Sequence, residues 1–475
     1  MSGSKQKTDK GLRIERQAVV IIHGIGEQRP MSTLRSFVSA IGKFPGKYGK
    51  PDGDGAPAHT WSRPDKLSEG FEHRRLSIPQ SSNRPKTDVY ELYWAHLFEQ
   101  TDSSTFMAWA KMLFLRKAKN FPPRMRPYLC VLRWVVPAIA LAIGVISYLI
   151  ANQPKSDPDL TLWPVLITVV AGAAISFIAQ WVSGFFLGTI SDAARYLDAS
   201  ARNVTSRNKA RELGVEFLER LHAAKDADNV DADKYDRIIV VGHSLGTVIG
   251  YDILKSYWYR VYEAFDPTKE APQDVVKEMR SAIKDTLEDK EAPDIHGWRD
   301  LQEQVWLEYR RIGNPWRVTD FVSLGSPLAH ADVLLATSEQ EFYDRQNEQE
   351  FPTAPPTLDP VSKEIWKDKT FNRPYDHPWS VKLLNHSAMF SVMRWTNVYF
   401  PVWGGVLGDP VGGPASPLFG PAVWDRPVRR DGQNERMSHL NYWAGQINRE
   451  DPQEPMTALE DAMQLERKWY GIPQD

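Results

Sequence analysis

The stretch from Tyr235 to Gly250 constrains the fold of this chain more than any other feature of the sequence. It contains an uninterrupted β-branched run from Ile238 to Val241, which is typical of a strand buried on both faces of a parallel sheet. Ser244 follows between Gly242 and Gly246, and glycines flank a serine in this way where a sharp turn leaves no room for Cβ atoms. Apolar residues then recur at helical spacing. The stretch therefore predicts a buried strand, a corner at Ser244 and the start of a helix.

This order of strand, Gly-x-Ser-x-Gly and helix is the form of a nucleophile elbow. On these residues the chain resembles the α/β-hydrolase superfamily, in particular its lipase- and esterase-like members. The resemblance implies an α/β fold with a mostly parallel sheet flanked by helices, and it makes Ser244 the catalytic nucleophile. The competing interpretation is an ordinary strand–helix turn without chemistry.

The overall composition excludes several function classes. The chain has 475 residues, of which 42% are hydrophobic, so it can bury a large core, and its formal net charge of -2 gives no sign of a nucleic-acid partner. The single cysteine, Cys130, excludes a disulfide framework and a thiolate metal site, and the histidines show no paired spacing. We therefore expect no metal and no cofactor. Residues 1–16 are polar and basic without an apolar run, and predict a disordered tail rather than a secretory signal.

A second glycine-rich turn follows the first expected strand, Ala18 to Ile22. In a chain with a nucleophile elbow, the turn His23-Gly24-Ile25-Gly26 resembles the hydrolase loop whose backbone N–H completes the oxyanion hole. The resemblance implies the Ile25 N–H as one donor, with Gly26 as the neighbouring alternative, and the Leu245 N–H as the second donor. The competing interpretation is a tight turn that serves packing alone.

Two long apolar runs in the middle of the chain predict a transmembrane helical hairpin at residues 128–190. Trp134 to Ala151 carries no charged residue, and a helix of this length spans about 27 Å, close to the roughly 30 Å hydrocarbon core of a bilayer. Leu160 to Ile190 is also free of charge and is longer. The alternative is a re-entrant or membrane-surface helical pair.

Basic residues set the expected orientation of the hairpin. Lysines and arginines cluster before it, from Lys111 to Arg133, and after it, from Arg195 to Arg211, whereas the loop from Asn152 to Asp159 has Lys155 alone. Both flanks are therefore expected to be cytoplasmic. The expected domains are a tail at 1–16, a first hydrolase part at 17–127, the hairpin at 128–190 and the rest of the hydrolase at 191–475.

Three further strands are expected in the sheet, at Val89–Trp94, at Val318–Leu324 before a Gly-Ser-Pro turn, and at Trp395–Phe400, the last clear strand. Two segments without a sustained period, Phe44–Pro85 and Glu339–Lys369, are expected to run over the surface. The charged, mainly helical segment Phe265–Asn314 is either a cap over the site or a solvated face, and we favour the solvated face slightly.

The resemblance also implies the acid of the triad. In the hydrolase family this acid lies in a loop after a late strand, and Asp409 occupies a glycine-rich loop after Trp395–Phe400. Asp332 is the main alternative, followed by Asp320 and Asp425.

The base follows from the family's chain order, which is Ser, then Asp or Glu, then His. His439 is the only histidine after Asp409, so the resemblance implies it as the base. We expect structural roles for His377 and His386. Ser326 lacks the second glycine of an elbow and is not expected to be a nucleophile.

Ser244, His439 and Asp409 together predict acyl transfer to water without a cofactor. The same triad serves esters, thioesters and amides, and the fold does not choose among them. The expected hairpin favours lipid esters, such as a phospholipid or acylglycerol, and an integral membrane protein whose catalytic domain faces the cytoplasm. Two alternatives stay open: a tethered hydrolase of soluble esters, thioesters or acylated protein, and a non-catalytic hydrolase-fold module whose hairpin is the working part. No oligomeric state follows from the sequence.

Overall fold

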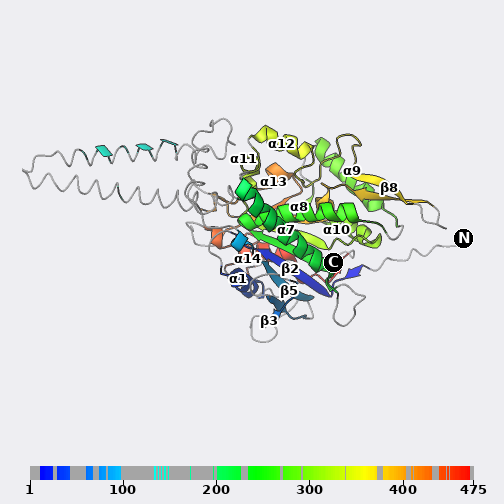
Figure 1. The fold of residues 1–475 in the computed structure, drawn as a ribbon, viewed down its shortest axis with the longest axis horizontal. Coiled ribbons are helices and arrows are strands. Elements are labelled where there is room, and N and C mark those ends of the chain that lie inside the picture. The colour runs from blue at the N-terminus through cyan, green and yellow to red at the C-terminus, as the bar shows by residue number, and fades with distance from the viewer. Residues whose placement is uncertain are drawn as a thin grey trace, which may run out of the picture.

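The structure, a computed structural model, contains one large sheet with helices on both sides (Figure 1). The residues that it describes are 11–24, 29–42, 60–67, 74–81, 84–97, 201–225, 234–267, 271–289, 293–336, 338–371, 378–402, 408–409, 411–429, 438–444, 447–448 and 450–470, together with single positions between 133 and 196.

The large sheet has eight strands in the order β11-β10-β7-β6-β2-β5-β4-β3. Their bounds are β2 (Arg16–Ile22), β3 (Trp61–Pro64), β4 (Arg74–Ile78), β5 (Lys86–Leu92), β6 (Arg237–His243), β7 (Val318–Leu324), β10 (Arg394–Tyr399) and β11 (Trp424–Pro427). All neighbours from β11 to β5 are parallel, whereas β4 and β3 pair antiparallel at the edge. The expectation of a mostly parallel sheet in an α/β protein is confirmed.

Helices cover the two faces of the sheet and enclose a core on each side (Figure 1). The covering helices are α1 (Ser32–Ile41), α7 (Ala201–Ala223), α8 (Leu245–Ala264), α10 (Ile295–Arg311) and α14 (Pro455–Met463). Successive side chains of a strand point to opposite faces, so Val20 of β2 packs in the core that contains α7, α8 and α10. Its neighbour Val19 packs in the core that contains α1 and α14.

Shorter elements complete the fold. The strands β1 (Leu12–Arg13) and β12 (Trp469–Tyr470) form one antiparallel pair, and β8 (Trp366–Phe371) and β9 (Trp379–Leu384) form another. The remaining elements are α9 (Asp274–Asp289), α11 (Ala331–Leu334), α12 (Glu339–Asn347), α13 (Ser416–Phe419) and the 3-10 turns η1 (Ala95–Leu97), η6 (Pro327–His330), η7 (Met389–Ser391) and η8 (Ser438–Leu440).

The structure corrects the prediction of a disordered tail at 1–16 in its last part. β1 pairs with β12, and Ile14 is 1% exposed in the core on the α7 side. The pairing partner lies near the other end of the chain, so a local sequence pattern could not indicate it. Residues 1–10 lie outside the described part of the chain.

Segments expected on the surface also contribute to the fold. The segment Phe44–Pro85 contains β3 and β4, and β4 buries Leu76 and Ile78. Glu339–Lys369 contains α12 and the first part of β8. In the segment expected to be a solvated face, α10 buries Trp298 and Trp306 in the core. β11 adds an edge strand after the one predicted to be the last clear strand.

The predicted hairpin at 128–190 lies outside the described residues except for single positions. Among those positions, Trp134, Leu141, Val145 and Tyr148 are 73%, 71%, 49% and 69% exposed. Side chains separated by three, four or seven residues share one face of a helix, so these four would form an apolar stripe. No helix within the described residues has both the length and the apolar character needed to span a bilayer.

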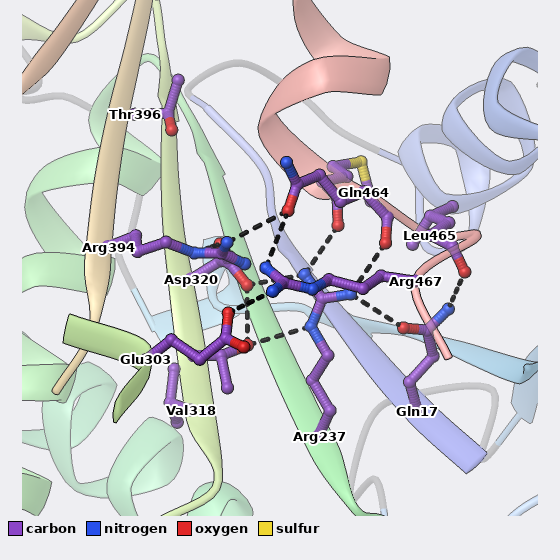
Figure 2. A network of polar contacts seen from close by, with 12 residues as sticks. Gln17, Arg237, Glu303, Val318, Asp320, Arg394, Thr396, Gln464, Leu465 and Arg467 are labelled. Atoms are coloured by element: carbon purple, nitrogen blue, oxygen red, sulfur yellow. Dashed lines mark hydrogen bonds and ion pairs between the residues drawn. The ribbon is translucent and has the colours of Figure 1, made fainter. Parts of the chain in front are cut away.

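A buried ion-pair network lies where the parallel strands begin (Figure 2). Asp320, near the start of β7, accepts hydrogen bonds from Arg237 Nη2 at 2.6 Å and from Arg394 Nε at 2.7 Å. Arg237 also donates to the carbonyls of Met463 (2.7 Å), the last residue of α14, and of Gln464 (2.9 Å), which follows it. Burial by itself raises the pKa of Asp320, but the two arginines outweigh it and hold that pKa below its ordinary value. The network ties the C-terminal segment to the sheet.

Candidate active site

The corner predicted at Ser244 lies at the carboxyl end of β6, at the opposite end of the sheet from the ion-pair network. Ser244 has φ 54° and ψ -128°, a conformation that residues with a Cβ rarely adopt. Such strain costs about 1–3 kcal/mol and persists only where the surroundings enforce it. Here the Ser244 N–H donates to Leu324 O at the end of β7 (2.9 Å), and the Ser244 carbonyl accepts from Thr247 N (3.0 Å). Two strand ends and the first turn of α8 therefore hold the serine.

The end of β2 approaches this corner closely. A Cβ atom on Gly246 would lie 2.1 Å from Ile22 O, so any side chain at this position would clash with backbone. A Cβ atom on Gly24 would lie 2.8 Å from the Cβ of Ser244 itself. The turn after β2 thus lies directly against the serine.

The structure describes one of the two residues whose N–H groups are expected in the oxyanion hole. Leu245 is the first residue of α8, where backbone N–H groups have no partner within the helix and the helix dipole favours negative charge. Ile25 and its alternative Gly26 lie outside the described residues.

The residues expected as acid and base contact each other. His439, in η8, donates its Nδ1–H to Asp409 Oδ2 at 2.9 Å. Asp409 is fully buried in the loop after β10, and its Oδ1 accepts from Val411 N at 3.0 Å. Burial alone raises the pKa of Asp409, but the electrostatic interaction with the His439 ring and the hydrogen bonds to the carboxylate outweigh it and lower that pKa. The carboxylate is therefore ionised and fixes the orientation of the imidazole.

His243 joins this acid–base pair to the corner. Its ring donates Nε2–H to the carbonyl of His439 at 2.8 Å, and the centroids of the two rings lie 5.0 Å apart. Burial, followed by the electrostatic interaction with the His439 ring, lowers the pKa of His243 to about 3, so the His243 ring is neutral at ordinary pH. The residue before Ser244 thus holds the loop that carries His439. In the described part of the chain no hydrogen bond joins Ser244 Oγ to His439, and such contacts often tighten only with substrate.

The alternative acids lie in other environments. Asp320 belongs to the ion-pair network, and Asp425 accepts from Asn397 Nδ2 (2.7 Å) and from Ala415 N (2.9 Å). Asp332 is buried in α11. Among the described residues, Asp409 is the carboxylate bonded to His439 Nδ1.

Within the described residues, neither Ser326 nor His386 makes a hydrogen bond to Asp409 or His439. Ser326 is buried, and its hydroxyl shares a 2.6 Å hydrogen bond with Thr247 Oγ1. The ring of His386 contacts Tyr259. His377 lies outside the described residues.

Sequence reasoning missed three side chains around the site, namely His243, Tyr442 and His23. Tyr442 donates its hydroxyl to Asp409 Oδ2 at 2.5 Å. His23 is buried, donates Nδ1–H to Gly24 O at 2.7 Å and stacks on Trp94, and burial lowers its pKa to about 4. No local pattern indicated Tyr442, because η8 ends at Leu440 and the contact joins Tyr442 to a residue 33 positions earlier in the chain.

Comparison with family models, with curated proteins and with solved structures finds no match to this chain.

Proposed function

We propose that this protein is a membrane-anchored serine hydrolase of the α/β-hydrolase type, which cleaves carboxylic esters through an acyl-enzyme on Ser244. One observation carries the proposal: a serine with positive φ ends a buried strand at the N-terminus of a helix, beside a bonded Asp409–His439 pair. Backbone strain at a polar residue is found preferentially at functional sites, because an inert turn would use glycine there. The sheet position agrees, since ligands of open α/β sheets bind outside the carboxyl ends of the strands.

The chemistry divides into two half-reactions. Ser244 Oγ attacks the ester carbonyl carbon while His439 Nε2, left unprotonated by the Nδ1–H bond to Asp409, accepts the hydroxyl proton. The C–O bond to the alcohol breaks, and the imidazolium gives its proton to the leaving alkoxide. Water then attacks the acyl-serine with His439 as base, which releases the carboxylic acid and restores Ser244.

The electrostatic contributions come from ionised Asp409 and from backbone N–H groups. Asp409 stabilises the imidazolium that forms in each half-reaction. The Leu245 N–H at the start of α8, with the N–H of Ile25, would hold the oxyanion.

We propose a lipid ester as the substrate, with the segment at 128–190 as the anchor. The apolar stripe of Trp134, Leu141, Val145 and Tyr148 supports this, because an exposed apolar surface of this kind marks contact with a membrane or a partner. Anchoring would raise the local concentration of lipid substrate without altering the acid–base pair.

Turnover of a short-chain soluble ester and of a lipid ester in vesicles tests the proposal. Purified wild-type protein should hydrolyse both, and release of the first equivalent of alcohol should precede steady turnover if the acyl-enzyme accumulates. Ser244→Ala should lose both activities. If Ser244→Ala retains wild-type turnover of both substrates, the assignment of the nucleophile is wrong.

A further inference from the structure

The hydroxyl of Tyr442 is the second hydrogen-bond donor to the carboxylate oxygen that holds His439. Asp409 Oδ2 accepts from His439 Nδ1 at 2.9 Å and from Tyr442 OH at 2.5 Å. The Tyr442 hydroxyl in turn accepts from Phe400 N at 3.3 Å. A backbone N–H can only donate, so the phenolic proton is directed to the carboxylate. Burial, and then the charge of Asp409, raise the pKa of Tyr442 well above its ordinary value, so the phenol stays protonated.

Two glycines from separate loops make room for this acid–phenol contact. A Cβ atom on Gly325, which has φ 57°, would lie 2.6 Å from the Tyr442 ring and 2.7 Å from Asp409 Oδ2. A Cβ atom on Gly412 would lie 2.9 Å from Asp409 Oδ2 and 3.1 Å from the Tyr442 hydroxyl. The Gly-Ser-Pro turn after β7 and the glycine-rich loop after β10 therefore both adapt to the pair.

We propose that Tyr442 is a positioning residue that sets both the direction and the basicity of Asp409 toward His439. A hydrogen bond to a charged acceptor is short and strong, and a fully buried one has no water to replace it. By drawing charge from Oδ2, the phenol weakens the hold of the carboxylate on a protonated imidazole. It also prevents the carboxylate from rotating away from the ring. The kinetic part of this inference rests on the proposed function, whereas the bonding part does not.

Tyr442→Phe tests this role, because it removes the hydroxyl and keeps the ring. The centroid of that ring lies 5.0 Å from the centroid of the Phe400 ring. Without the phenol, Asp409 holds the imidazolium more strongly, so the acid limb of the kcat/KM profile should move to higher pH. We expect kcat to fall by about tenfold and KM to change by less than about twofold, as for a group that acts on the reacting base rather than on substrate binding.

Tyr251→Phe is the matched control. Tyr251 is also buried, at 1% exposure, and its hydroxyl donates to Pro352 O at 2.8 Å. Removal of the Tyr251 hydroxyl should lower the Tm and leave the acid limb of the kcat/KM profile at the same pH. If Tyr442→Phe behaves like Tyr251→Phe, with a lower Tm and an unmoved acid limb, Tyr442 is a packing residue and the inference is overturned.

A second readout does not depend on turnover. The downfield proton resonance of His439 Nδ1–H reports its hydrogen bond to Asp409, and it should move further downfield in Tyr442→Phe. An unchanged His439 resonance in Tyr442→Phe would overturn the inference, whether or not the wild-type protein hydrolyses esters. A wild-type protein without esterase activity but with the shifted resonance in the variant would refute the proposed function and leave the role of Tyr442 standing.

Discussion

At the scale of single residues, the backbone of Ser244 stores strain that a simple turn would not need. Its φ of 54° suits glycine, yet the chain retains a side chain with a hydroxyl at this point. His243 and Thr247 on either side are fixed by hydrogen bonds, which keep the corner in this conformation. The serine is therefore held in place by its neighbours at a local energetic cost.

The stored strain can be measured by a pair of substitutions. Ser244→Ala keeps a Cβ at the strained position, whereas Ser244→Gly removes it. We expect the glycine variant to be more stable than the alanine variant by about 1 kcal/mol, despite the greater flexibility of glycine in the unfolded chain. Urea unfolding of both variants provides the comparison. Equal stabilities, or a less stable glycine variant, would show that the corner carries no strain.

The choice of acid can be tested by exchanging Asp409 and Asp332 separately for asparagine. Asp409→Asn should reduce kcat by about ten-thousandfold, because an amide there favours the wrong imidazole tautomer. Asp332→Asn should retain near-normal rates, since Asp409 is the carboxylate bonded to His439 among the described residues. Steady-state ester hydrolysis compares the two. A large loss of kcat in Asp332→Asn, with a normal kcat in Asp409→Asn, would identify Asp332 as the acid of the triad.

At the scale of elements, the central strands could be predicted because each is a nearly continuous apolar run. The expected strand from Ala18 to Ile22 corresponds to β2, and the run from Ile238 to Val241 corresponds to β6. Both lie inside the sheet, where burial on two faces leaves a strong sequence signal. The edge strands β3 and β11 are short and have little buried surface, so the sequence shows no clear pattern for them.

The candidate site was predictable where it depended on motifs. The glycines around Ser244 and the loop of Asp409 are visible in the sequence. By contrast, His243 and Tyr442 act through hydrogen bonds between segments far apart in the chain, to the loop of His439 and to Asp409. A single sequence shows which residues can donate and accept, and not which of them the fold brings together.

The predicted hairpin is tested by replacing residues 128–190 with a short flexible linker. The shortened protein should still cleave a soluble short-chain ester, because the described site residues lie outside that segment. It should be much slower on lipid in bilayers, where each lost basic or apolar anchor weakens attachment. Vesicle flotation and parallel assays provide the measurement. An equal loss on both substrates would show that the segment belongs to the folded core.

At the scale of the whole molecule, the two ends of the sheet differ in chemistry. The site lies at the carboxyl ends of the strands, and the network around Asp320 lies at their amino ends (Figure 2). This separation allows the network to hold the C-terminal segment against the sheet without restricting the site. Changes to the network should therefore alter stability more than catalysis.

Asp320→Asn tests this division of roles. It leaves Arg237 and Arg394 buried without their shared partner and should lower the free energy of unfolding by about 3–5 kcal/mol. The matched control is Glu219→Gln, which breaks an ion pair with Arg260 that is 42% and 45% exposed, and should cost less than about 1 kcal/mol. Urea unfolding measures both. If Asp320→Asn lowers the free energy of unfolding by no more than Glu219→Gln does, the stabilising role of the network is contradicted.

The pH dependence of stability gives a further test of the same carboxylate. The pKa of Asp320 is lower in the folded protein than in the unfolded chain, so its stabilisation is present above the unfolded value of about 3.9 and is lost as pH falls toward the folded value. Wild-type stability should therefore drop more steeply below about pH 4 than that of Asp320→Asn. Parallel curves for the two proteins would refute this linkage.

The central claim is that Ser244 is an activated nucleophile, and the most direct test is covalent labelling of purified protein with a fluorophosphonate probe. We predict one adduct per chain by intact mass, located on the peptide that contains Ser244 and absent from Ser244→Ala. The same peptide should lose its label when His439→Ala is treated in parallel, because the base is needed to activate the hydroxyl. A well-folded wild-type protein that takes up no label, or that is labelled at another serine such as Ser326, would contradict the claim.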